Sequence, residues 1–112
     1  MLIFSSHKGT EITINLWDMA GQEDYPRFRV LSYPQIDVFL FFFSVVNPIT
    51  FEHLVQKWIP EVAAHCPYAG RVLVGVDKSL RTDETTLQSL QNRGLKPITE
   101  FQALELAHAI DA

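Results

Sequence analysis

Asp37-Val38-Phe39-Leu40-Phe41-Phe42-Phe43 is the stretch of this sequence that decides the fold. After the aspartate the run is entirely apolar and rich in aromatic residues, which is typical of a strand buried on both faces, as in a parallel sheet. Asn47-Pro48 follows closely and indicates a helix start, because asparagine is a favoured capping residue and proline fits the first helical position. These features predict a buried strand that leads directly into a helix.

The segments that follow continue to alternate between helical and strand patterns. Apolar residues recur at helical spacing over residues 51–58, and Pro60 is expected to kink this helix. Val72-Leu73-Val74-Gly75 predicts a second short buried strand. Because strands and helices alternate, the chain is predicted to be an α/β domain with a largely parallel sheet.

Two further helices are predicted after the second strand. Residues 82–92 are mostly polar and are expected to form a short, weakly anchored helix that Gly94 closes. Thr99-x-x-Gln102 is a capping box, and it opens a last helix. The residues of this helix that are expected to pack inward are Leu104, Ala107 and Ile110.

A β-hairpin is predicted ahead of the apolar run. Residues 2–6 favour a strand, Lys8-Gly9 is typical of a turn, and residues 11–17 alternate strictly between polar and apolar. Residues 18–29 are polar and are interrupted by glycine and proline, so a loop is expected there.

The composition is that of one globular domain. With 112 residues, of which 47% are hydrophobic and 20% charged, the chain is too short for two domains and too apolar for a disordered segment.

A net charge of −4 without a basic cluster argues against a nucleic-acid partner. Cys66 is the only cysteine, which excludes an internal disulfide and suits a reducing compartment. The longest apolar stretch, residues 38–46, is too short to span a membrane, so a cytoplasmic location is expected.

Leu16-Trp17-Asp18-Met19-Ala20-Gly21-Gln22-Glu23-Asp24-Tyr25 resembles the switch II segment of Ras-like small GTPases. Within that group the sequence is similar to the Rho family over nearly its whole length. Residues 82–93 correspond to the short extra helix that distinguishes Rho proteins. The other segments that carry the resemblance are residues 31–40, Phe43-Ser44-Val45-Val46, Phe51-Glu52, residues 57–62, His65-Cys66-Pro67 and Pro97-Ile98-Thr99.

This resemblance implies a Ras-like fold of the P-loop NTPase type and a site for GTP or GDP with Mg²⁺. Asp18 corresponds to the acid that holds Mg²⁺ through water, and Ala20 and Gly21 lie on the γ-phosphate side. Gln22 corresponds to the catalytic residue that orients the attacking water. The implied function is GTP binding and GTP hydrolysis in signal transduction. Taken alone, the same residues are equally compatible with an ordinary polar turn.

Tyr25, Phe28 and Leu31 correspond to an apolar surface of switch II. In the Rho family this surface meets regulators and effectors, including exchange factors and GTPase-activating proteins. A packed switch helix is the alternative role for these side chains.

The chain departs from the family pattern at the guanine-recognition motif. Rho proteins have Thr-Lys-x-Asp after the strand that ends here in Gly75, whereas this chain has Val76-Asp77-Lys78-Ser79. Ser79 replaces the carboxylate that accepts two hydrogen bonds from guanine, and a neutral hydroxyl cannot form that pair. Asp77 occupies the position of the lysine. The alternative interpretation of Lys78 and Ser79 is a solvated turn.

No phosphate-binding motif G-x-x-x-x-G-K-[ST] occurs among the 112 residues. The central first strand, the first helix, switch I, and the last strand and helix of the family fold are likewise expected to be missing. No cysteine for a lipid anchor stands at the C-terminus. Residues 1–112 are therefore predicted to be a partial Rho-type G domain with the hairpin, switch II and the Rho insert helix. Three hypotheses stay open: a GTP-hydrolysing switch, a nucleotide-free module that contacts Rho regulators, and a truncated product without activity.

Overall fold

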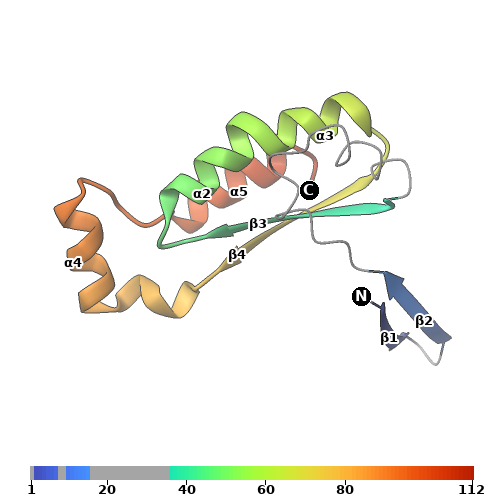
Figure 1. Ribbon diagram of the computed structural model, residues 1–112, viewed down its shortest axis with the longest axis horizontal. Coiled ribbons are helices and arrows are strands. Elements are labelled where there is room, and N and C mark those ends of the chain that lie inside the picture. Colours follow the sequence, from blue (N-terminus) through green and yellow to red (C-terminus); the bar gives the residue numbers. More distant parts are fainter. Residues whose placement is uncertain (1, 8–9, 16–35) are drawn as a thin grey trace. The chain divides into compact units, whose positions relative to one another are not determined.

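The structure is a computed structural model, and it describes residues 2–7, 10–15 and 36–112. The chain divides into two units, Met1–Ser32 and Tyr33–Ala112. The first unit contains a β-hairpin, and the second contains a parallel pair of strands with its helices (Figure 1).

The hairpin of the first unit consists of β1 (Leu2–His7) and β2 (Thr10–Asn15), which pair antiparallel. Leu2 lies opposite Asn15, and His7 lies opposite Thr10. The hairpin that the period-2 pattern predicts is thus confirmed. The last two residues of its predicted second strand, Leu16-Trp17, lie outside the described residues.

The parallel pair of the second unit consists of β3 (Val38–Ser44) and β4 (Gly70–Val76). The register places Val38 opposite Gly70 and Ser44 opposite Val76, so the strands are paired over their full length. The predicted α/β class with parallel strands is confirmed. In the part of the chain that the structure describes, β3 pairs with β4 alone.

The connection between β3 and β4 is a helical segment in three parts: α2 (Pro48–His53), the π-helical turn η3 (Leu54–Trp58) and α3 (Ile59–His65). Pro48 takes the first turn as predicted, but the Asn47 side chain makes no capping hydrogen bond. Pro60 cannot donate to a preceding carbonyl, and its ring would crowd the carbonyl four residues earlier. The chain meets this constraint with the wider turn just before Pro60, where Ile59 N–H donates to Leu54 O, and the helix then continues.

Two further helices follow β4 after the short 3₁₀ turn η4 (Lys78–Thr82). In α4 (Glu84–Asn92) the N-cap is Asp83, and Gly94 has φ of +70° just beyond the C-terminus, as the predicted helix stop requires. In α5 (Glu100–Ala109) both hydrogen bonds of the predicted capping box are present. In the described part of the chain, no helix has the length and apolar character of a membrane span.

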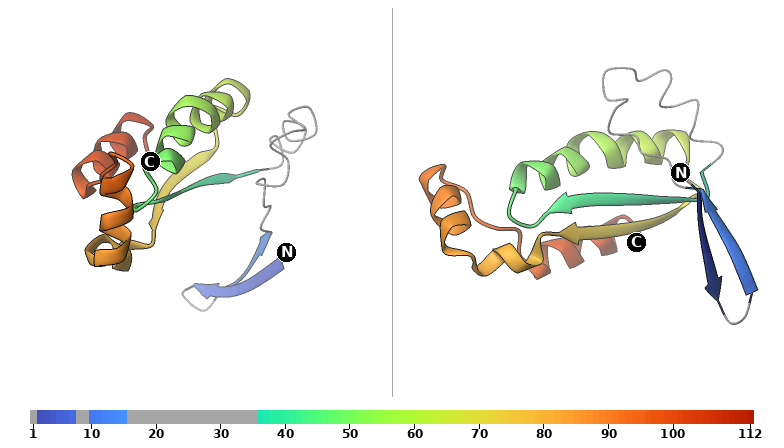
Figure 2. Two further views of the ribbon diagram at one scale, coloured as in Figure 1. Left: turned by 60° about the vertical axis from the view of Figure 1, so that its left-hand side comes forward. Right: turned by 60° about the horizontal axis from the view of Figure 1, so that its bottom comes forward.

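The helical segment from α2 to α3 and the helix α5 pack beside the strand pair, whereas α4 projects beyond the ends of the strands (Figures 1 and 2). The core centres on Phe43, whose ring contacts Phe51 of α2 edge-on with 5.0 Å between ring centroids. Phe43 stands opposite Gly75 in register, and a Cβ built on Gly75 would lie 3.0 Å from the Phe43 ring. Glycine at this position therefore makes room for the phenylalanine.

The two faces of β3 differ in burial, which corrects the prediction of a strand buried on both faces. Phe39, Phe41 and Phe43 are buried, and they lie on the face that α2 covers. The alternate residues lie on the opposite face, which none of the described helices covers. The exposed apolar side chains of this face are Val38, Leu40 and Phe42 of β3 with Val72 and Val76 of β4.

The inward stripe of α5 also differs from the prediction. Leu104 is exposed, whereas Ile110 just beyond the helix is buried. Ala103 and Ala107 are partly buried, so the stripe begins one residue earlier than the leucine spacing suggests.

Acidification is expected to weaken α4. The Asp83 carboxylate accepts hydrogen bonds from Thr86 Oγ1 at 2.7 Å and Thr86 N at 2.9 Å. The hydrogen bond from the Thr86 side chain has the larger effect, and together with the bond from Thr86 N–H it holds the pKa of Asp83 below its ordinary value of 3.8. Because the pKa is lower in the folded than in the unfolded chain, the ionised Asp83 stabilises the folded α4 at pH values above the unfolded pKa. This stabilisation is lost as the pH falls through the folded pKa.

Amide hydrogen exchange in α4, followed from about pH 6 to about pH 2 and corrected for intrinsic exchange, measures this effect. Protection of α4 should decline at the acid end in the natural chain. Asp83→Asn keeps a capping side chain but has no titrating group, so its α4 protection should lose this pH dependence. The same acid decline in both proteins would contradict the assignment to Asp83.

Candidate functional site

The carboxyl ends of β3 and β4 meet at one edge of the parallel pair, where open α/β sheets bind their ligands. Ser44 ends β3 and stands opposite Val76, which ends β4. Val45 N–H donates to Val76 O at 3.0 Å and extends the pairing by one bond. The residues predicted for guanine recognition, Asp77, Lys78 and Ser79, follow directly.

Asp77 forms the sharp turn between β4 and η4. Its φ of 64° lies in the left-handed region, which aspartate tolerates better than most residues with a side chain. Its carbonyl accepts Leu80 N–H at 3.0 Å, which starts η4. Ser44 Oγ donates to Asp77 Oδ2 at 2.8 Å, so the carboxylate faces the end of β3.

Lys78 and Ser79 begin η4, and both are exposed. The Ser79 hydroxyl carries no charge and cannot accept two parallel hydrogen bonds in the way a carboxylate does. The carboxylate of Asp77 lies two residues earlier, and its Oδ2 accepts a hydrogen bond from Ser44. The position from which the family motif recognises guanine with a carboxylate therefore carries only the Ser79 hydroxyl.

The residues predicted for the phosphate and Mg²⁺ side of the site lie outside the described residues, as does the predicted partner surface. Their assignments stay predictions. These residues are Asp18, Ala20, Gly21, Gln22, Tyr25, Phe28 and Leu31. Among the residues that the structure does describe, no group of three or more His, Cys, Asp or Glu side chains is placed to hold a metal ion.

Ser44 is the site residue that sequence analysis missed. It supplies the donor to Asp77, although 33 positions separate the two residues. A polar residue at the end of an apolar strand carries no sign of its partner, because parallel pairing alone brings the two strand ends together.

The family model described as the Ras family matches residues 4–111, which is nearly the entire chain. The chain belongs to the Ras family. Its parallel strands and helices are accordingly those of a partial Ras-like α/β domain. Members of this family are small GTPases, which generally bind GTP or GDP with Mg²⁺ and act through regulators and effectors.

Proposed function

We propose that this chain is a Rho-type small GTPase domain that takes part in signal transduction mainly through contacts with Rho regulators and effectors. In this proposal, the binding of guanine nucleotide is weaker than in the family and contributes less to the function. The Rho assignment is supported by the segments that resemble Rho proteins and by the short helix α4, which lies between β4 and α5, where the resemblance leads us to expect the Rho insert. We place this activity in the cytoplasm.

The altered guanine-recognition turn is the observation that carries the proposal. Ser79 stands where the family has its guanine-binding carboxylate, and the Asp77 carboxylate is bonded to Ser44. A site that loses the buried polar group recognising a substrate typically loses discrimination by about 10⁴-fold. Selective guanine binding by these residues is therefore weakened, while the Tyr25, Phe28 and Leu31 surface retains its residue types.

A GTP-binding and GTP-hydrolysing switch is the alternative function, with Gln22 orienting the attacking water. A titration of the 112-residue chain with fluorescent GDP, GTP and ATP in Mg²⁺ separates the two. We expect no saturation at sub-micromolar nucleotide and no marked preference for guanine over adenine. Ser79→Asp and Ser79→Asn form a matched pair, since only the aspartate restores a bidentate acceptor. Tight, guanine-selective binding by the natural chain would establish the alternative.

Partner binding provides the positive test. A purified Rho exchange factor domain should bind the chain equally well with and without added GTP. Tyr25→Ala and Phe28→Ala should each weaken this binding about tenfold or more, because interface aromatics are the commonest hot spots. Tyr68→Ala is the matched control, since Tyr68 is a strongly exposed tyrosine outside the proposed surface. Equal losses for Tyr25 and Tyr68, or no binding, would contradict the proposal.

A further inference from the structure

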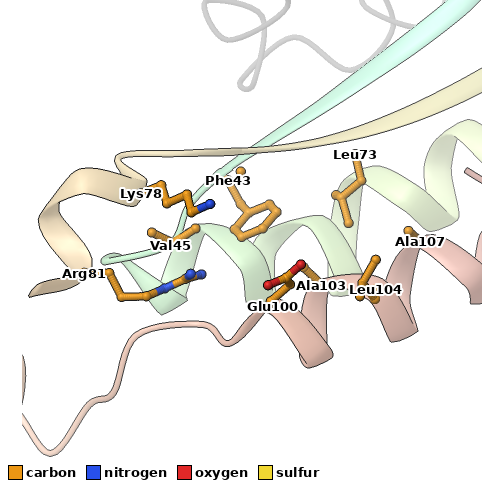
Figure 3. A pocket seen from close by; sticks show the side chains of 10 residues that line it. Phe43, Val45, Leu73, Lys78, Arg81, Glu100, Ala103, Leu104 and Ala107 are labelled. Carbon is orange, nitrogen blue, oxygen red and sulfur yellow. The ribbon is translucent and has the colours of Figure 1, made fainter.

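A cavity of about 250 Å³, open to solvent, lies between the carboxyl-terminal halves of β3 and β4 and the inner side of α5 (Figure 3). Phe43, Val45 and Leu73 contribute apolar side chains from the strand side. Leu104 contributes another from α5, at the open edge of the cavity, where most of its side chain stays exposed. The cavity is thus apolar on two sides.

Three charged side chains surround the same space. Lys78 and Arg81 reach it from η4, and Glu100 reaches it from the first turn of α5 (Figure 3). In the part of the chain that the structure describes, no ion pair joins Glu100 to either cation. The lining therefore carries a net charge of +1 that no described acid neutralises.

The Arg81 side chain is held in place, but it is short of acceptors. One of its terminal nitrogens donates to Ile98 O at 2.9 Å. Ile98 is in turn fixed by its N–H, which donates to Val45 O at 2.8 Å. Arg81 Nε is buried and has no hydrogen-bond partner among the described residues, so it is not itself accessible to a ligand. The second terminal nitrogen makes no hydrogen bond with a described residue, and it is the guanidinium donor that an anion could use.

We propose that this cavity is a binding site for a small aromatic carboxylate. The net charge of +1 matches one anionic group, and the planar guanidinium of Arg81 suits a carboxylate. The apolar lining, which includes the Phe43 ring, suits an aromatic body. The volume falls below the roughly 300–1,000 Å³ of sites for drug-sized ligands, which limits the ligand to about one ring. Lys78 also belongs to the altered guanine-recognition turn, but this inference does not depend on the proposed signalling function, because neither its argument nor its test involves a nucleotide or switch II.

The test is an NMR titration of the 112-residue chain with benzoate, and with benzamide as the neutral probe of nearly the same shape. Benzoate should shift the amide signals of Gly75, Lys78 and Ala103 in a saturable way. Benzamide should bind at least about fivefold more weakly, because it lacks the charge that the cations attract. Equal binding of both probes, or shifts scattered outside the cavity, would overturn the proposal.

Charge variants give effects of opposite sign, which a general loss of structure cannot mimic. Lys78→Gln should weaken benzoate binding about fivefold, whereas Glu100→Gln should strengthen it about fivefold by removing the one acid of the lining. Lys96→Gln is the matched control, since Lys96 is an exposed lysine outside the cavity and should leave the affinity unchanged. Weaker or unchanged binding in Glu100→Gln would refute the assignment.

Discussion

Replacing Phe43 with alanine is expected to lower the free energy of unfolding of the Tyr33–Ala112 unit by about 3–5 kcal/mol, the range for removing a core phenylalanine. The side chain is 3% exposed, and its ring fills the space between Phe51 and Gly75. Alanine leaves a cavity there, because the glycine opposite has no side chain that could move into it. The loss is a large fraction of the roughly 5–15 kcal/mol that stabilises a typical domain, so urea unfolding followed by circular dichroism would show a much earlier transition.

Phe42→Ala is the matched control for this experiment. Phe42 is the preceding residue of the same strand, but it is 54% exposed on the face that no described helix covers. Its replacement should cost less than about 1 kcal/mol, as for most surface positions. An equally large loss for Phe42 would mean that the outer face of β3 is covered in solution, and it would contradict the one-sided core.

Leu90→Ala is expected to destabilise the α4 region by about 2–5 kcal/mol. Leu90 is 1% exposed, the lowest value among the buried hydrophobic side chains of the described residues, and its carbonyl also accepts Leu95 N–H at 2.8 Å. The effect should be strongest around α4, because this helix projects beyond the ends of the strands (Figure 1). Hydrogen exchange resolved by residue measures it, since local opening is seen there before global unfolding.

Leu87→Ala, one helical turn earlier, distinguishes burial from helix propensity. Leu87 is 36% exposed in the same helix, and alanine is the better helix former. Its replacement should therefore change protection in α4 far less than Leu90→Ala does. Similar losses at both positions would show that α4 is anchored over a wider face than the structure indicates.

Much of the local structure follows from sequence patterns. The period-2 alternation predicts the hairpin, and Pro48 marks the start of the helix after β3. Thr99 with Gln102 predicts the capping box, and Gly94 predicts the end of α4. Each signal acts through groups a few residues apart, so no knowledge of distant contacts is needed.

The candidate site could be predicted in part. The position of Asp77, Lys78 and Ser79 after β4 follows from the strand pattern and the family motif. The sequence does not predict the hydrogen bond between Ser44 and Asp77. It also does not predict that Lys78, Arg81 and Glu100 line the same cavity. These groups come from separate elements, and only the parallel pairing of β3 with β4 and the docking of α5 bring them together.

The sequence by itself determined where the described strands and α-helices occur, although it did not predict the turns η3 and η4. It also determined membership of the Ras family through the similarity of nearly the whole chain. The tertiary structure alone decided which phenylalanines of β3 are core residues and which are exposed. A run of six apolar residues has the same hydrophobicity on both faces, so the pattern cannot distinguish them. The distinction arises because α2 packs on one face of the strand pair, and burial depends on that packing rather than on the residue type.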